Sequence, residues 1–305
     1  MALTLALTAP SRAQSQSTDQ PRATLLKFQT LKTHSTPIVE LKFKDGTKGR
    51  FFIDTGADWC MVREGFAKQL HLMDTPPPSP VPSSITINNK PYRTVMIRDA
   101  QLGDSILGSA PAFVIPDKLV KSFTDESIDG GIGVGFFHVC PVLLNFREHE
   151  MAFWARSPVP EDYLKKWNSA KAIEVPIEPI EENGCFAVSV TINDKVKAKM
   201  LFDTGAARTT LTESISKALE LSSEPNELST MTFRGRQPRF AAEVKKLDIG
   251  SSSTLNLRVN LAPGKDAKEH SLLGMNVLAR YAMIIDLPAR KLYLIAFSPQ
   301  NVPVH

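Results

Sequence analysis

The sequence predicts an all-β fold, mainly antiparallel with short helices, and built from two similar halves. Short segments such as Val39–Phe43 alternate apolar and charged residues, the pattern of a strand with one buried face. Turn dipeptides such as Asp45-Gly46 follow these segments, as they do in hairpins. The segment Phe51–Val62 reappears as Met200–Leu211, 149 residues later. Together these observations predict two lobes of hairpins in tandem.

The internal repeat extends well beyond this segment. Ile38–Leu72 aligns without a gap with Ala187–Leu221, and 11 of the 35 residue pairs are identical. A repeat of this length indicates a tandem duplication, so each element expected in one half is expected again in the other.

Each half is expected to follow one order of elements. A hairpin ends at an Asp-Thr-Gly-Ala turn, a helix and a second hairpin follow, and the half ends with two paired strands. The expected segments are the helices Arg63–Leu72 and Thr212–Leu221, the hairpin turns Asn88-Asn89 and Arg234-Gly235, and the strands Val142–Phe146, Met151–Trp154, Met283–Leu287 and Leu292–Ala296.

These elements divide the chain into four parts. Residues 25–154 and 185–305 are expected to form the two lobes, which are related by a pseudo-twofold axis. Residues 155–184, rich in Pro and charge, are expected to link them, with a short helix near Glu161–Asn168. Residues 1–24 are interpreted as a signal-sequence remnant or a disordered tail. The signal interpretation favours a periplasmic or secreted protein, and the tail interpretation a cytoplasmic one.

Composition excludes several classes of protein. Hydrophobic residues make up 42% of the chain and charged residues 22%, as in a soluble globular protein. The apolar runs are shorter than the roughly 20 residues of a membrane helix, so no integral membrane segment is expected. The net charge of +4 is too small to indicate a nucleic-acid partner. The three Cys residues show no metal-type spacing, and we expect no metal and no cofactor.

The duplicated turns carry the chemistry that we expect. Asp54 and Asp203 each follow three apolar residues, which places a carboxyl group close to the core. If the halves pack about a twofold axis, the two carboxyl groups face each other and share one proton. One can then act as a base and the other as an acid on a water molecule between them.

The residues after each Asp support this interpretation. The hydroxyl groups of Thr55 and Thr204 can lock the two turns together. Gly56 and Gly205 allow a backbone N–H to approach a carboxylate without a Cβ clash.

Both halves resemble the retropepsin-like aspartic peptidases, which are related to retroviral proteases and more distantly to pepsin. The matching residues are the two Asp-Thr-Gly-Ala turns and the motif Leu272-Leu273-Gly274, for which the first half has Gly131-Ile132-Gly133. The resemblance implies an aspartic-type endopeptidase that hydrolyses an extended peptide or protein in the cleft between two lobes of one chain. It also implies that Ala57, Asp58 and Ala206 contact substrate.

Departures from the family pattern predict asymmetry. The glycine-rich first-half motif is expected to support Asp54 less firmly, and the second half has Ala207 in place of Asp58. The first-half hairpin, Ser83–Tyr92, lacks the glycines common in a flap. Its Tyr92 is either a flap aromatic or an ordinary strand residue. Pepsins usually carry Ser or Thr where this chain has Ala57 and Ala206, so we expect an optimum at weakly acidic pH.

Other interpretations remain at this stage. The same fold could form a weakly active or inactive peptide-binding or assembly module. Cys60, next to the first turn, is interpreted as a buried structural residue, with a thiol nucleophile as the alternative. We expect a monomer whose halves form an intramolecular pseudo-dimer; pairing with the halves of a second chain is the alternative.

Overall fold

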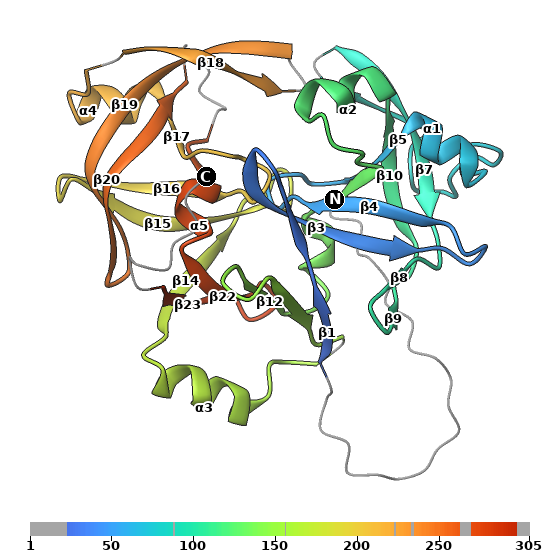
Figure 1. Cartoon of the computed structure of the whole chain (residues 1–305), viewed down its shortest axis with the longest axis horizontal. Helices are drawn as coiled ribbons and strands as arrows, with labels where there is room; N and C mark the ends of the chain where they lie inside the picture. The colour runs from blue at the N-terminus through green and yellow to red at the C-terminus, as the bar shows by residue number, and fades with distance from the viewer. Residues whose placement is uncertain are drawn as a thin grey trace.

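The computed structural model describes residues 23–87, 89–155, 157–222, 224–232, 235–262 and 270–297. The expected signal remnant or tail therefore lies almost entirely outside the described residues, as do Asn88 and Arg234 at the expected hairpin turns. No helix within the described ranges is long and apolar enough to cross a membrane. Strands dominate the molecule, which confirms the all-β class (Figure 1).

The elements of the first half are mostly short strands. In chain order they are β1 Thr24–Lys27, β2 Gln29–Leu31, β3 His34–Lys42, β4 Lys48–Ile53, β5 Cys60–Arg63, α1 Glu64–Gln69, β6 Ser84–Ile87, β7 Lys90–Ile97, β8 Gln101–Leu102, β9 Ser105–Ile106, β10 Ala110–Ile115, α2 Asp117–Phe123, β11 Gly130–Ile132, η1 Val134–Phe136, β12 Val142–Asn145 and β13 Glu150–Phe153.

A helix and a strand precede the second half, whose own elements follow a similar order. They are α3 Glu161–Ser169, β14 Ile173–Pro179, β15 Phe186–Ile192, β16 Val196–Phe202, β17 Thr210–Leu211, α4 Glu213–Ala218, β18 Glu224–Thr232, β19 Gly235–Ile249, β20 Ser252–Leu261, β21 Leu272–Leu273, α5 Met275–Leu278, β22 Tyr281–Asp286 and β23 Lys291–Ala296.

The first hairpin of each half forms as the alternating pattern predicts. β3 pairs with β4 and β15 pairs with β16, both antiparallel. The turns use residues that tolerate positive φ, Gly46 in the first half and Asn193 and Asp194 in the second. The helices α1 and α4 are shorter than the sequence pattern suggests. Each ends before a residue with positive φ, His71 or Glu220, that the helical spacing included.

A short parallel strand supports the Asp-Thr-Gly turn in each half. β11 lies parallel to β4 and antiparallel to β5. β21 lies in the same way between β16 and β17. Both short strands therefore end beside the Asp-Thr-Gly turn of their own half.

Strands from both halves form one continuous sheet across the molecule. β12 of the first half pairs with β22 of the second, with Val142 opposite Ile285. This pairing joins β1, β12 and β13 to the second-half strands in a 13-stranded sheet, while most first-half strands form a separate 10-stranded sheet. Figure 1 shows β1, β12, β14, β22 and β23 together below the two lobes. The sheet fixes the lobes relative to each other.

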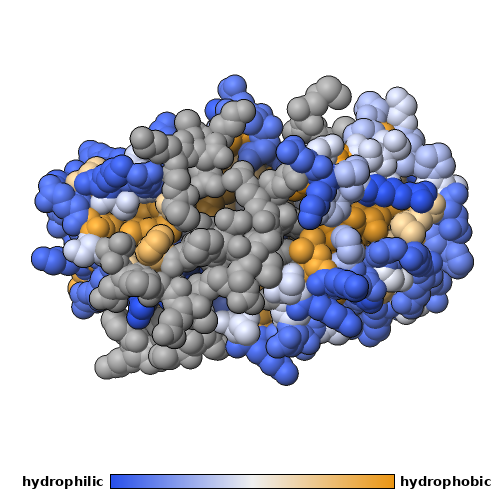
Figure 2. All heavy atoms as spheres, turned by 90° about the horizontal axis from the view of Figure 1, so that it is seen from above, coloured by the Kyte–Doolittle hydropathy of each residue, from blue (hydrophilic) through white to orange (hydrophobic). Residues whose placement is uncertain are grey.

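The hydrophobic core also runs through both halves. Its largest fully buried side chains include Phe51, Phe136 and Trp154 of the first half and Phe202 and Tyr281 of the second. Seen from above, hydrophobic residues show as patches on both sides of the molecule, each bordered by hydrophilic residues (Figure 2). The two lobes therefore share one large core, and a second, smaller cluster that includes Met61, Tyr92 and Phe113 lies in the first half.

The expected linker, residues 155–184, contains more structure than the sequence analysis assigned to it. The helix α3 forms where expected. The strand β14 was not predicted; it pairs with β23 on one side and β15 on the other. The last part of the segment thus belongs to the sheet of the second half.

The second hairpins of the two halves differ in length. In the first half, β6 and β7 form a short hairpin in which Tyr92 is buried and packs edge-to-face on Phe113, with ring centroids 6.0 Å apart. This packing favours the ordinary strand interpretation of Tyr92. In the second half, β18 and β19 are long, and β18 reaches helix α2 of the first half (Figure 1). The two hairpins therefore differ in length, and the second-half hairpin contacts the other half through β18 and α2.

Candidate active site

The two Asp-Thr-Gly turns are held by matching backbone hydrogen bonds. The N–H of Asp54 donates to the carbonyl of Ile132 at 2.9 Å, and the N–H of Asp203 donates to Leu273 at 3.1 Å. The carbonyls of Ala57 and Ala206, on the far side of each turn, both accept an N–H at 2.8 Å, from Val134 and Met275. The end of the short parallel strand and the first residue of the helix that follows it thus each hold one side of the turn.

The glycine-rich first-half motif supports Asp54 as fully as its counterpart supports Asp203. The expectation of weaker support was wrong because large neighbours replace the missing bulk. A Cβ at Gly131 would lie 2.8 Å from the ring of Phe52, and one at Gly130 would lie 2.4 Å from the ring of Phe51. In the second half, Met200 and Leu201 stand at the positions of the two phenylalanines and are smaller than they are. Ser271 and Leu272 stand at the positions of the two glycines and are larger.

Thr55 and Thr204 join the two turns to each other. The N–H of Thr55 donates to Oγ1 of Thr204 at 3.1 Å, and the N–H of Thr204 donates to Oγ1 of Thr55 at 3.0 Å. Each hydroxyl also donates to the carbonyl just before the Asp of the other half. The hydroxyl of Thr55 donates to Phe202 at 2.7 Å, and that of Thr204 donates to Ile53 at 2.8 Å. Both threonines are fully buried. Each turn therefore depends on the other half for its hydrogen bonds.

The carboxyl groups lie against the glycines of the opposite turns. A Cβ added to Gly56 would lie 2.5 Å from Cγ of Asp203, and one added to Gly205 would lie 2.6 Å from Cγ of Asp54. Side chains at these positions would collide with the carboxylates. The two carboxyl groups are also close enough for each to shift the pKa of the other.

The environment raises the pKa of both carboxyl groups. Desolvation is the main cause for each. The pKa of Asp54 lies well above its ordinary value because the neighbouring charge of Asp203 adds to the effect of burial. Asp54 and Asp203 nevertheless remain only half-buried, so each keeps some solvent-exposed surface.

The backbone stabilises the two carboxylates unequally. Oδ1 of Asp203 accepts the N–H groups of Gly205 at 2.8 Å and Ala206 at 3.0 Å. Oδ1 of Asp54 accepts the N–H of Gly56 at 3.0 Å, and the N–H of Ala57 contributes less. Because hydrogen bonds to the charged form favour that form, the backbone favours the carboxylate form of Asp203 more than that of Asp54.

The residues expected to contact substrate follow directly after the turns. Ala57 and Ala206 are half-buried. The side chain of Asp58 is exposed, and partial desolvation raises its pKa. The matching residue of the second half, Ala207, is also exposed and carries no charge. The surroundings of the two turns are thus asymmetric in charge.

The cysteine thiols near the site are buried. Burial raises the pKa of Cys60 to about 11 and that of Cys140 to about 12, and it raises the pKa of Cys185 as well. These thiols stay protonated at neutral pH, which favours the structural interpretation of Cys60. In the part of the chain that the structure describes, no three His, Cys, Asp or Glu side chains gather as metal ligands would.

The sequence analysis missed two residues beside the second turn. Thr36 is buried, and its hydroxyl donates to the carbonyl of Thr204 at 2.7 Å. Oγ1 of Thr36 also lies 2.8 Å from Nδ1 of His34. The two stand at the start of β3, where no motif marks them. The repeat gives one indication that the two residues are special to the first half. At the matching positions the second half has chemically different residues, Asn183 for His34 and Cys185 for Thr36.

Comparison with known proteins agrees with this geometry. A family model described as "Aspartyl protease" matches residues 39–136, and one described as "gag-polyprotein putative aspartyl protease" matches residues 188–280. The search of curated proteins found no match.

Solved structures with a similar fold were also found. A retropepsin-like aspartic protease from Rickettsia conorii is 24% identical, with a TM-score of 0.34, and the match covers 40% of this chain and 90% of that one. Conglutin gamma, a basic 7S globulin from lupine seeds, is 12% identical, with a TM-score of 0.51, and the match covers 92% and 96% of the two chains. The second likeness shows a shared fold along almost the whole length.

The paired strands, the two clamped Asp-Thr-Gly turns and the facing carboxyl groups define an aspartic-protease fold. The chain belongs to the retropepsin-like aspartyl protease family and carries two such domains in tandem.

Proposed function

We propose that the protein is an aspartic-type endopeptidase that hydrolyses peptide bonds with Asp54, Asp203 and a water molecule. One observation carries the proposal. The two carboxyl groups come from different halves, yet each lies against the glycine of the opposite turn, and the reciprocal bonds of Thr55 and Thr204 hold the two turns together.

The unequal surroundings of the carboxyl groups suggest their roles. Asp203, with two backbone N–H donors, takes a proton from the water as the water oxygen attacks the peptide carbonyl carbon. Asp54, whose pKa is raised further, donates its proton to the carbonyl oxygen as the carbon becomes tetrahedral. The C–N bond then breaks as the leaving nitrogen takes the proton that Asp203 accepted. A hydroxyl group of the tetrahedral intermediate returns its proton to Asp54, which leaves a carboxylic acid product and restores the pair.

The substrate that we propose is an extended peptide or unfolded protein lying between the lobes. The exposed surface left on Asp54 and Asp203 supports access from solvent. Ala57, Asp58 and Ala206 follow the two turns, where they would contact the substrate backbone. The exposed carboxylate of Asp58 on one side only would give the two sides of the cleft different preferences.

One chain supplies both halves of the proposed site, so we propose a monomer. Light scattering is expected to give the mass of one 33.6 kDa chain under the conditions of the assay. Activity confined to a species of twice that mass would contradict this part of the proposal.

Incubation with a denatured protein between pH 3 and pH 7 tests the proposed activity. An endopeptidase is expected to produce internal cuts, read by mass spectrometry as new pairs of termini. The alternative, a peptide-binding module on the same fold, would retain the peptide without new termini. Binding without cleavage at every pH would therefore contradict the proposal.

A further inference from the structure

A chain of hydrogen bonds runs from the first half to the carboxylate of Asp203. Thr36 donates to the carbonyl of Thr204, and this carbonyl belongs to the same peptide group as the N–H of Gly205. That N–H donates to Oδ1 of Asp203 at 2.8 Å. The hydroxyl of Thr36 therefore acts on the peptide group that holds the Asp203 carboxylate.

The direction of each bond follows from the number of available protons. A hydroxyl has one proton, and a carbonyl oxygen can only accept, so the proton of Thr36 goes to Thr204. The contact between Thr36 and His34 then requires Nδ1 of the imidazole to donate. Nδ1 carries a proton in this tautomer and in the imidazolium form, so the donation holds in both charge states.

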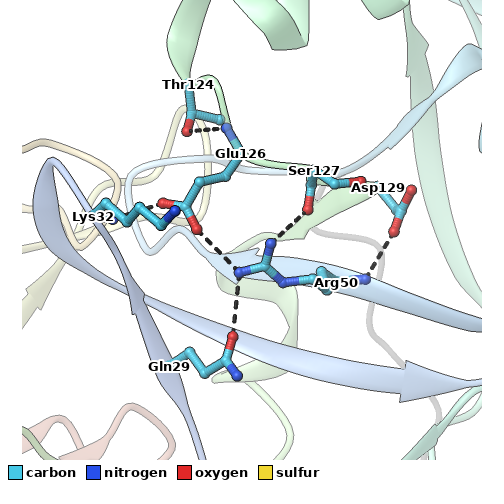
Figure 3. Close-up of polar contacts among 7 residues, drawn as sticks. All are labelled: Gln29, Lys32, Arg50, Thr124, Glu126, Ser127 and Asp129. Carbon is cyan, nitrogen blue, oxygen red and sulfur yellow. Dashed lines mark hydrogen bonds and ion pairs between the residues drawn. The ribbon is translucent and has the colours of Figure 1, made fainter.

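A polar network lies near His34. Glu126 accepts the N–H of Lys32 at 2.6 Å and a bond from Arg50 at 3.2 Å (Figure 3). Arg50 also donates to the carbonyl of Ser127 at 2.9 Å. This network ties the start of β3 to the segment that leads into β11. Glu126 is the charged group that acts on His34, whose pKa burial lowers.

This series of hydrogen bonds exists only on the Asp203 side of the site. The repeat places Cys185 at the position of Thr36 and Asn183 at that of His34. The side-chain oxygen of Asn183 accepts the N–H of Cys185. Among the described residues, no side chain donates to the carbonyl of Thr55, which is the counterpart of the Thr204 carbonyl. The peptide group beside Asp54 thus lacks the support that the one beside Asp203 receives.

We propose that Thr36, oriented by His34, is a positioning residue that fixes and polarises the Thr204–Gly205 peptide group and so stabilises the carboxylate form of Asp203 over that of Asp54. Successive hydrogen bonds polarise one another, and the effect is larger where water is excluded. Thr36 and Thr204 are buried, as this effect requires. The inference deepens the proposed function, because it gives the physical origin of the unequal roles of the two carboxyl groups.

Titration of the aspartate carboxyl groups tests the inference without requiring activity. In the full chain, ¹³C NMR follows the Cγ signals of Asp54 and Asp203, each identified by its loss in the corresponding Asp→Asn variant. Thr36→Val is expected to raise the lower apparent pKa of the pair by about 0.2 to 0.6 unit. Thr36→Ser, which keeps the hydroxyl, is expected to restore it. Thr254→Val, a change at a buried threonine of β20, controls for lost burial of a hydroxyl.

The outcomes separate this inference from the proposed activity. If the chain cleaves peptides, the acidic limb of its kcat/KM profile is expected to move with the NMR titration in Thr36→Val. A Thr36→Val titration that superimposes on the wild type overturns the inference, whether or not the chain cleaves peptides. Should Thr36→Val fail to fold, His34→Phe removes the donor to Thr36, and the same shift, smaller in size, is expected. An unchanged titration in His34→Phe then overturns the inference.

Discussion

Thr55 and Thr204 each donate a backbone N–H to the other's hydroxyl oxygen, at 3.1 and 3.0 Å, across the boundary between the two halves. The exchange means that neither Asp-Thr-Gly turn has its full set of hydrogen bonds without the other. The duplicated sequence therefore forms one site, and the stability of the lobes and the geometry of the carboxyl groups are coupled.

Removal of either hydroxyl is expected to destabilise the whole chain. In Thr55→Val, the N–H of Thr204 and the carbonyl of Phe202 lose their partners inside the protein. Burying two unpaired backbone groups is expected to lower the free energy of unfolding by about 2–4 kcal/mol, measured by urea denaturation. Thr254→Val is the control. An equal loss in both variants would contradict the role assigned to Thr55.

Small additions at the glycines are expected to separate the carboxyl groups. The Cβ of Gly56→Ala would lie 2.5 Å from Cγ of Asp203, so one of the two turns must move. We expect kcat/KM to fall by about 10²-fold. Gly46→Ala is the matched control, since nothing lies within 4 Å of its added Cβ although its φ is +86°. It is expected to lose about 1 kcal/mol of stability and keep its activity. Full activity in Gly56→Ala would contradict the described contact.

The raised pKa of Asp54 has a consequence for stability. A carboxyl group whose pKa is raised in the folded state binds its proton more tightly there than in the unfolded chain. Stability therefore falls as the pH rises from the ordinary value near 3.8 towards the raised value. Asp54→Asn removes this effect, so the variant is expected to be more stable than the wild type at pH 7. The difference should shrink on acidification and vanish below about pH 3.8.

Thermal unfolding at several pH values measures this difference. Asp104→Asn, at an exposed position, is the control and should show no such trend. An Asp54→Asn variant that is less stable than the wild type at pH 7 would contradict the raised pKa.

Activity is expected to be greatest at weakly acidic pH. The proposed mechanism needs one proton on the pair, and burial raises the pKa of both groups. Neither Ala57 nor Ala206 offers a hydroxyl that could lower either pKa. A kcat/KM profile against pH checks the expectation, and a maximum below about pH 3 would contradict it.

Local patterns predicted most of the strands. The alternation along Val39–Phe43 and the turn at Asp45-Gly46 were sufficient for the first hairpin, because in this part of the chain the apolar residues are buried and Glu40 and Lys42 are exposed. β14 was missed although Ile173, Val175 and Ile177 alternate with more polar residues. Its two prolines favoured a linker, yet the strand pairs on both sides.

The site was predictable only as far as the motif extended. The Asp-Thr-Gly repeat indicated both carboxyl groups, both threonines and both glycines. Thr36 lies 168 residues from the carbonyl that it contacts, and nothing local to the sequence signals such a contact. The compensation of Gly131 by the ring of Phe52 was missed for a similar reason, because it depends on the pairing of β11 with β4.

The most direct test of the central proposal is cleavage of a denatured protein by Asp54→Asn and Asp203→Asn, each compared with the wild type and with Asp104→Asn. The proposed mechanism uses both carboxyl groups for proton transfer, so either change is expected to lower kcat/KM by about 10²- to 10⁴-fold. Asp104→Asn should cleave as the wild type does, and circular dichroism should show that all variants are folded. Substantial hydrolysis by either Asp54→Asn or Asp203→Asn would contradict a mechanism that depends on the pair.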